Sequence, residues 1–185
     1  MRKNAFLLFF WGFFFVMLNV NINNFDLLPD VIGYILFAVG LNILSKENIF
    51  FLKAQNYNWF LIALSIMKLW NYYISVTYFQ ISFKFIVIFL FTVLYFVINI
   101  LMVKNLFLGI SCMREIEDNP YLFVEANENY KYYKYLQIGG IAAFIIIFIP
   151  KIGFIYAIAL FILSILIMIN IMNFMKRCEE EYNKK

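Results

Sequence analysis

The sequence predicts an all-α fold, a polytopic membrane bundle of about six transmembrane helices. Hydrophobic residues make up 65% of the 185 residues, and the mean hydropathy is +0.83. Both values exceed those of a typical soluble domain. The apolar residues fall into six long runs with almost no charge inside them. Each run spans about 15 to 24 residues, whereas the strands of a membrane barrel would alternate over about 10.

The predicted spans follow one another closely, so residues 1–185 should form a single integral-membrane helical domain. The first follows a basic start, as a signal peptide would, but no small-residue cleavage site comes after it. We therefore expect a retained helix. The second opens at a proline and an acid, which suit the first turn of a helix. The six spans are, in order, about Ala5–Asn19, Leu28–Leu44, Trp59–Tyr78, Phe83–Val103, Tyr135–Pro150 and Ile152–Met175.

The start of the third span is open to two interpretations. Residues 49–54 form an apolar cluster bounded by Lys46 and Lys53. Such a cluster suits a short helix lying in the plane of the membrane interface. Alternatively, the third span simply begins earlier in the chain.

The segment Lys104–Lys134, between the fourth and fifth spans, is the only substantial polar segment. Leu106, Ile110 and Met113 recur at helical spacing, so the fourth helix should continue beyond its span. It should stop at Asp118-Asn119-Pro120, a strong turn signal. A second helix should then return to the membrane. The sequence thus predicts a short cytoplasmic helical hairpin, which is either a connector or a docking surface for a protein partner.

Lysine and arginine predict the orientation, because they are retained on the cytoplasmic side of a membrane. With the N-terminus inside, the outer segments hold only Lys68, Lys84 and Lys151. An even number of spans then places both termini in the cytoplasm, in a multi-pass protein of the cell membrane. The inner segments hold twelve basic residues: Arg2, Lys3, Lys46, Lys53, Lys104, Arg114, Lys131, Lys134, Lys176, Arg177, Lys184 and Lys185.

Asp26 and Asp30 are the only acidic residues in the outer half. Their spacing invites comparison with aspartate motifs that hold a divalent metal and a diphosphate, but such a site needs more oxygen ligands than this pair supplies. Stabilisation of the start of the second helix is the favoured role. Binding of a solute, or a role in assembly, stays open.

Lys68 would lie near mid-membrane if the third span began at Trp59, and a lysine there costs about 2.5–3.5 kcal/mol unless it finds a partner. It could pair with Asp26 or Asp30. If the span begins earlier, Lys68 instead sits near the outer end of its helix. These two interpretations have equal weight.

Small and amide residues within the spans predict helix–helix contacts. Asn99 and three other asparagines should hydrogen-bond across helices. Gly33 and Gly40 fall on one face of the second span, where they favour close packing against a neighbouring span or a second copy of the chain. The other asparagines are Asn42, Asn170 and Asn173.

One segment carries a resemblance. Leu28-Pro29-Asp30-Val31-Ile32-Gly33-Tyr34-Ile35-Leu36, followed by Gly40-Leu41, is similar to a signature in small, uncharacterised multi-spanning bacterial membrane proteins. It covers less than a tenth of the chain. Those proteins have no assigned activity, so the resemblance implies a family and no function.

Composition argues against several classes of function. The chain has no histidine, and Cys112 and Cys178 lie far apart, so neither a zinc site nor a disulfide framework is expected. Without histidine, metalloprotease motifs and histidine-dependent serine proteases are excluded. The basic residues lie beside span ends and form no nucleic-acid patch. We expect no enzyme activity, no metal and no cofactor.

Two functions remain. The first is a non-enzymatic accessory or assembly protein of the membrane, acting through helix contacts, with the lipid bilayer, a protein partner or a second copy as its partners. The second is a small-solute transporter, because six spans in a chain of this size resemble the substrate-binding membrane subunits of energy-coupling-factor vitamin transporters. The alanine-spaced docking motif of those subunits is absent, since Ala5 is the only alanine in the first span.

Overall fold

The computed structural model describes residues 4–18, 21–22, 25–26, 30–69, 83–146 and 149–183. Apart from short turns, these residues form helices and two strands of two residues each, so the all-α prediction is confirmed. The strands form a small antiparallel ladder in which Asn21 faces Asp26 and Ile22 faces Phe25. The elements are α1 (Ala5–Met17), β1 (Asn21–Ile22), β2 (Phe25–Asp26), α2 (Asp30–Leu44), α3 (Ile49–Leu69), α4 (Phe83–Ser111), α5 (Arg114–Glu117), α6 (Pro120–Ile146) and α7 (Pro150–Asn183).

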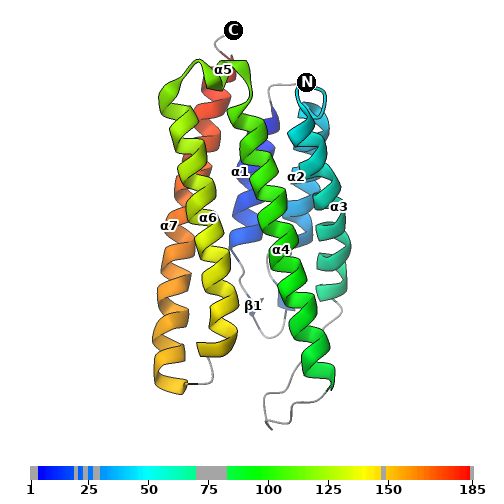
Figure 1. Cartoon of the computed structure of the whole chain (residues 1–185), viewed down its shortest axis with the longest axis vertical. Helices are drawn as coiled ribbons and strands as arrows, with labels where there is room; N and C mark the ends of the chain where they lie inside the picture. Colours follow the sequence, from blue (N-terminus) through cyan, green and yellow to red (C-terminus); the bar gives the residue numbers. More distant parts are fainter. Residues whose placement is uncertain are drawn as a thin grey trace.

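The long helices form a closed ring. Each helix packs against the next along the chain, α1 on α2, α2 on α3, α3 on α4, α4 on α6 and α6 on α7, and α7 returns to α1. Figure 1 shows these helices running along one common direction, with α5 and the C-terminal end of α7 at the same end of the bundle. An Arg177–Glu125 ion pair joins α7 to α6.

Phe13 of α1 lies at the centre of the ring. Its ring centroid is 4.9 Å from that of Phe37 on α2, 6.0 Å from that of Tyr133 on α6 and 6.1 Å from that of Phe107 on α4. The Phe107 ring also packs against Phe174 of α7, at 5.7 Å. All five side chains are almost completely buried. Aromatic pairs at such separations add stabilisation beyond that of buried area, so these rings hold five helices together.

The predicted spans correspond to helices with different ends. α1 and α2 match the first two spans to within two residues. α4 continues to Ser111, α6 starts at Pro120 and α7 runs to Asn183. Each of these three helices therefore extends beyond its predicted span at the end that lies nearer to α5 (Figure 1). α3 starts ten residues earlier than the predicted third span. Residues 70–82, which include the predicted end of that span, lie outside the described residues.

Asn48 explains why α3 begins early. Its Oδ1 atom accepts hydrogen bonds from the backbone N–H groups of Phe50 and Phe51, at 3.1 and 3.3 Å. Asparagine is among the favoured residues for capping a helix in this way. The Asn48 Nδ2 group also donates to the carbonyl oxygen of Gly109 on α4, at 2.9 Å. The helix therefore starts at Ile49, which confirms the longer third helix and leaves no separate interfacial helix at residues 49–54.

The segment between α4 and α6 contains the predicted turn at Asp118-Asn119-Pro120, but the fourth helix ends at Ser111 and does not continue to that turn. α4 ends at Ser111, the single-turn α5 follows, and α6 begins at Pro120. Proline suits the first position of a helix, because its missing N–H would have no partner there. Asn119 Oδ1 accepts from the N–H of Leu122 at 3.4 Å. Two helices joined by this turn form the predicted hairpin.

The helices differ in whether they could cross a membrane. Among the described residues, two segments are long and apolar enough to do so, Phe89–Ser111 and Lys151–Asn183. α1 and α2 are apolar but have only 13 and 15 residues. At 1.5 Å per residue they are about 20 and 22 Å long, which is less than a hydrocarbon core of about 30 Å. The structure thus supports two crossing helices by this criterion, and not six.

Glycine allows α1 and α2 to approach closely. A Cβ atom on Gly33 would lie 2.6 Å from Val16 Cγ2 and 2.8 Å from the carbonyl oxygen of Gly12. A Cβ on Gly40 would lie 2.5 Å from the Phe9 ring. Both glycines of the second span therefore face α1 of the same chain. Of the two predicted partners, a neighbouring span and a second copy, the structure shows the neighbouring span.

Gly33→Ala should destabilise the bundle, because the backbone oxygen of Gly12 cannot move aside as a side chain can. Overpacking of this kind costs about 1–3 kcal/mol, part of which the higher helix propensity of alanine offsets. We expect a lower midpoint of thermal unfolding of the purified protein in detergent.

Gly139→Ala is the matched control. Its Cβ would meet the Leu160 Cδ2 methyl at 3.1 Å, a flexible contact, and the Tyr156 hydroxyl at 3.4 Å. This variant should melt at or above the wild-type temperature. Equal melting of the two variants would contradict the importance of the α1–α2 contact.

Candidate functional site

Three pairs of polar residues, each spaced four residues apart, meet inside the bundle. They are Asp30 and Tyr34 on α2, Tyr95 and Asn99 on α4, and Tyr133 and Gln137 on α6. Residues four apart lie on the same face of a helix, one turn above the other. Each helix therefore presents two polar side chains to the same interior region.

Five of these side chains form one continuous hydrogen-bond chain. Tyr133 OH donates to Asn99 Oδ1 at 2.8 Å, and Asn99 Nδ2 donates to Tyr34 Oη at 2.8 Å. The hydroxyl groups of Tyr34 and Tyr95 are 2.6 Å apart, and Tyr95 OH donates to Asp30 Oδ2 at 3.1 Å. The hydrogen-bond chain runs from Tyr133 on α6 to Asn99 on α4 and then to Tyr34 on α2. From there it returns to α4 at Tyr95 and ends on α2 at Asp30.

The number of protons that each group can donate determines which group is the donor in every bond of this hydrogen-bond chain. A phenol has a single proton to donate. Tyr95 gives its proton to Asp30, so in the bond between the two tyrosines Tyr34 is the donor. The Nδ2 group of Asn99 can donate but cannot accept, so the bond to Tyr34 cannot reverse. Every bond therefore donates toward the carboxylate of Asp30.

Four of the five side chains in this hydrogen-bond chain are buried, and Tyr95 is half-buried. Tyr34 and Tyr133 are completely buried, Asn99 is 1% exposed and Asp30 is 4% exposed. In addition, the buried Asn58 on α3 donates through Nδ2 to the backbone carbonyl oxygen of Tyr34, at 2.8 Å. Buried polar groups are costly unless they are hydrogen-bonded, and here they bond to one another.

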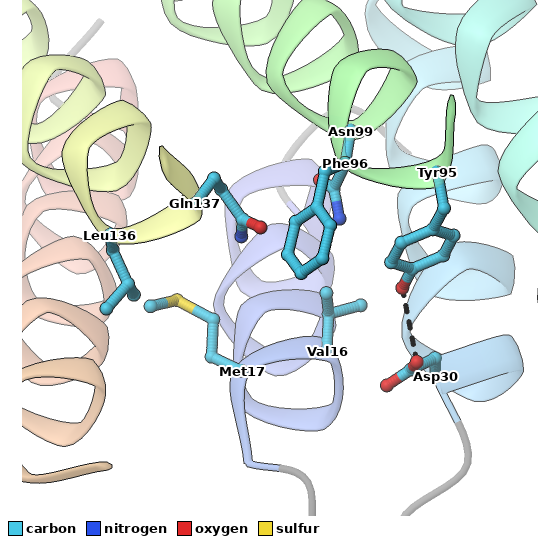
Figure 2. Close-up of a pocket in the computed structure, with 8 residues that line it drawn as sticks. All are labelled: Val16, Met17, Asp30, Tyr95, Phe96, Asn99, Leu136 and Gln137. Atoms are coloured by element: carbon cyan, nitrogen blue, oxygen red, sulfur yellow. Dashed lines mark hydrogen bonds between the residues drawn. The ribbon is translucent and has the colours of Figure 1, made fainter. Parts of the chain in front are cut away.

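A cavity of about 170 Å³ that is partly open to the surroundings lies against this hydrogen-bond chain. Figure 2 shows its lining side chains converging from α1, α2, α4 and α6, with Asp30 and Tyr95 on one side and Met17 and Leu136 on the other. The cavity is found where α1 ends and α2 begins. Four of the lining residues are polar and four apolar: Asp30, Tyr95, Asn99 and Gln137, and Val16, Met17, Phe96 and Leu136.

The structure treats the predicted site residues differently. Asp30 and Asn99 both belong to the hydrogen-bond chain and line the cavity. Asp26 pairs through its backbone with Asn21 in the small ladder, and its side chain lies outside the described part of the chain. Lys68 is the penultimate residue of α3, and its side chain also lies outside it. An ion pair between Lys68 and either aspartate stays a prediction.

Of the four asparagines predicted to join helices, Asn99 does so, whereas Asn42, Asn170 and Asn173 are exposed. The prediction was wrong for those three, because each falls on the outer face of its helix. Tyr34, Tyr95, Tyr133 and Gln137 were not among the predicted site residues. Their spacing relative to Asp30 and Asn99 was the signal that could have identified them.

No group of three or more potential metal ligands occurs among the described residues. Comparisons with protein-family models, with curated proteins and with solved structures found no match to this chain. The cavity and the hydrogen-bond chain are therefore the features from which a function can be argued.

Asn99→Ala should destabilise the protein strongly, because it removes the acceptor for Tyr133 and the donor to Tyr34. An unsatisfied buried hydroxyl costs about 1–3 kcal/mol. The expected result is a clear drop in the midpoint of thermal unfolding, measured in detergent by intrinsic fluorescence.

Asn127→Ala on α6 serves as the control for this change. Asn127 is exposed, and its Nδ2 donates to the carbonyl oxygen of Phe123 on the same helix, at 3.1 Å. Surface changes of this kind stay within about 0.5 kcal/mol. If the two alanine variants melted together, the hydrogen-bond chain would have no stabilising role.

Proposed function

We propose that this chain is a multi-pass protein of the cytoplasmic membrane that binds a small polar solute in the cavity between α1, α2, α4 and α6. The observation that carries the proposal is the cavity itself, a space lined by four polar side chains inside an otherwise apolar bundle. Ligand sites in helical bundles are built in this way, from side chains on facing helices. The proposal involves no catalytic step.

The distribution of charge supports a membrane location with both ends of the chain in the cytoplasm. α1 begins, α2 ends, α4 ends and α7 ends at one end of the bundle, where α5 also lies (Figure 1). Basic residues near these helix ends include Lys46, Arg114 and Lys176. Retention of lysine and arginine on the cytoplasmic side favours this end as the inner one.

The exposed side chains of α7 support the same location. Phe154 and Ile155 are 70% and 68% exposed, and further isoleucine, leucine and phenylalanine side chains follow along the helix. A helix that presents apolar side chains over most of its surface is stable when hydrocarbon surrounds it. We propose that this half of α7 faces lipid.

The short α1 and α2 helices support solute binding. α1 ends and α2 begins at the cavity, about 20 Å from the inner end of the bundle at 1.5 Å per residue. Helices interrupted within a membrane are tolerated where they are buried in protein or line a cavity, and transporters place their binding sites at such interruptions. The cavity between the ends of these two helices has this arrangement.

A second candidate is the accessory or assembly function. Tyr121, Phe123 and Val124, in the first turns of α6, are 68%, 42% and 54% exposed. This end of α6 is the proposed cytoplasmic end, where apolar side chains favour a protein partner. The experiment on solute binding separates the two candidates, because an accessory protein requires no solute in the cavity.

Leu136→Phe should abolish solute binding by filling the cavity, which Leu136 lines. We would screen small amines, alcohols, sugars and carboxylic acids for an increase in the melting temperature of the purified protein. A ligand that binds only the folded state stabilises it by about 1.4 kcal/mol at ten times its Kd. At least one solute should raise the melting temperature of the wild type and leave that of Leu136→Phe unchanged.

Ile138→Phe, on the outer face of the same helix, is the matched control. Ile138 is 50% exposed, so this variant should respond to the solute as the wild type does. A screen without any stabilising solute would refute solute binding and favour the accessory function.

Thiol labelling tests the proposed orientation. Cys112, between α4 and α5, is exposed, and Cys178 is buried. A membrane-impermeant maleimide should label Cys112 in inverted membrane vesicles and fail to label it in intact cells. Cys112→Ser should remove the signal, because Cys178 is accessible only after unfolding. Labelling of Cys112 in intact cells would contradict the proposed orientation and place this end of the bundle outside the cell.

A further inference from the structure

The outward face of α4 changes from apolar to basic along its length. Leu90, Leu94 and Val97 are exposed, and the next exposed residue toward the α5 end of the bundle is Lys104. Spacings of four, three and seven residues place these four side chains on one face of the helix. This face is therefore hydrocarbon that ends in a cation on the side nearer to α5.

α6 presents the same order on its own outward face. Lys131, Tyr135 and Ile138 are exposed and lie at positions i, i+4 and i+7, which share one side of a helix. Lys131 is the member nearest to the α5 end, and residues 138–146 carry no charge. Each of the two helices thus has a lysine followed, away from α5, by apolar side chains.

The hydrogen bond from Tyr133 to Asn99 fixes the relative height of the two lysines. Toward α5, Lys104 is five residues from Asn99 on α4, and Lys131 is two residues from Tyr133 on α6. At 1.5 Å per residue the two lysines therefore differ in height by about 5 Å. α4 and α6 pack side by side (Figure 1), and the axes of packed helices are about 8–10 Å apart. Both long side chains can therefore reach one anionic group.

Lys134 adds a third cation at the apolar edge of this surface. Its Nζ atom lies 6.0 Å from the centroid of the Tyr130 ring and 5.4 Å from that of Tyr135. Rings of this kind attract the ammonium group and suit the level at which hydrocarbon meets lipid headgroups. Glu128, which is exposed one turn before Lys131, is the nearest acidic residue along α6. Three lysines against one glutamate leave this surface positively charged.

We propose that the outward face of α4 and α6 binds an anionic phospholipid of the inner leaflet. The phosphate lies at the lysine site, defined as Lys104, Lys131 and Lys134, and the acyl chains follow the apolar side chains from there to Leu90 on α4 and Ile138 on α6. Basic sites between membrane helices on the cytoplasmic side recognise such headgroups. This proposal rests on the membrane location and orientation proposed above, and it is independent of solute binding in the cavity.

The dimensions of the face fit a lipid. Lys104 and Leu90 are 14 residues apart on α4, which is about 21 Å. One leaflet of hydrocarbon is about 15 Å thick, half of the apolar core of a bilayer. The face is therefore long enough for a complete acyl chain beyond the lysine site.

The charge of the face favours an anionic lipid over other ligands. Lysine stems can lie along hydrocarbon while their ammonium groups reach the phosphate. A zwitterionic headgroup carries its own cation, which weakens its attraction to the lysine site. A soluble anion carries the charge but makes no use of the apolar side chains.

Thermal unfolding in mixed micelles tests the proposal. The purified protein in dodecyl maltoside would be titrated with phosphatidylglycerol and, separately, with phosphatidylcholine that has the same acyl chains. A ligand that binds the folded state raises its stability, so phosphatidylglycerol should give a saturable rise in melting temperature. Phosphatidylcholine, and inorganic phosphate at the same ionic strength, should give a smaller rise or none.

Two double variants locate the effect. Lys104→Gln with Lys131→Gln changes two exposed side chains, so this protein should fold as the wild type does. A basic residue beside an anionic lipid surface contributes about fivefold in affinity. The concentration of phosphatidylglycerol that gives half of the maximal rise should therefore increase about 25-fold. Lys46→Gln with Lys176→Gln removes the same charge from exposed positions elsewhere and should keep the wild-type response.

Three outcomes would overturn the lipid site. Equal stabilisation by phosphatidylcholine would show that the charge is not recognised, and equal stabilisation by inorganic phosphate would assign the lysines to a soluble anion. An unchanged response of the Lys104→Gln, Lys131→Gln protein would place lipid binding elsewhere. Each outcome leaves the result of the solute screen unaffected. Recovery of the protein in the soluble fraction of cells lysed without detergent would instead refute the membrane location, and both proposals with it.

Discussion

Tyr34 is the residue through which the hydrogen bonds of the interior are joined. Its hydroxyl group bonds to Tyr95 and Asn99 on α4, and its backbone carbonyl oxygen accepts from Asn58 on α3. These groups are largely buried, so hydrogen-bond partners in the protein offset the cost of their burial. Gly33, the residue before Tyr34, allows α1 to approach α2 closely. The packing of α1 and the pairing of polar groups are thus parts of one arrangement.

This arrangement explains how an apolar bundle can contain a carboxylate. Asp30 sits at the first residue of α2, where the positive end of the helix stabilises negative charge. The chain of donors from Tyr133 through Asn99 and Tyr34 to Tyr95 orients each dipole toward it. Hydrogen bonds in a low dielectric environment polarise one another. One side of the cavity therefore presents Asp30 and Tyr95, and the other presents Met17 and Leu136 beside the amide of Gln137 (Figure 2).

The sequence predicted the helical class and most helix positions, because long apolar runs and the Asn119-Pro120 turn are local signals. It left two starts of α3 open because Lys53, Asn56 and Asn58 make residues 49–58 more polar than a span, and the earlier start is the one observed. It also missed the ladder at residues 21–26, since two-residue strands carry no periodic pattern. For the site, Asp30 and Asn99 were selected as polar residues in apolar surroundings. The tyrosines were not, because a phenol ring suits both an interior and a membrane interface, and only the arrangement of α2, α4 and α6 shows which applies.

The ring of helices closes between the first and the last helix of the chain, where α1 packs on α7 and Phe6 lies against Tyr182. During synthesis, α1 leaves the ribosome long before α7 has been made. Until then, the face of α1 that α7 covers has no partner within the chain. The final architecture can form only after translation of α7, although α1 and α2 can already pair through their glycines. A ribosome that stalls before α7 would therefore release a product in which this apolar face of α1 is uncovered. Quality-control proteases and chaperones could distinguish that form from the finished protein.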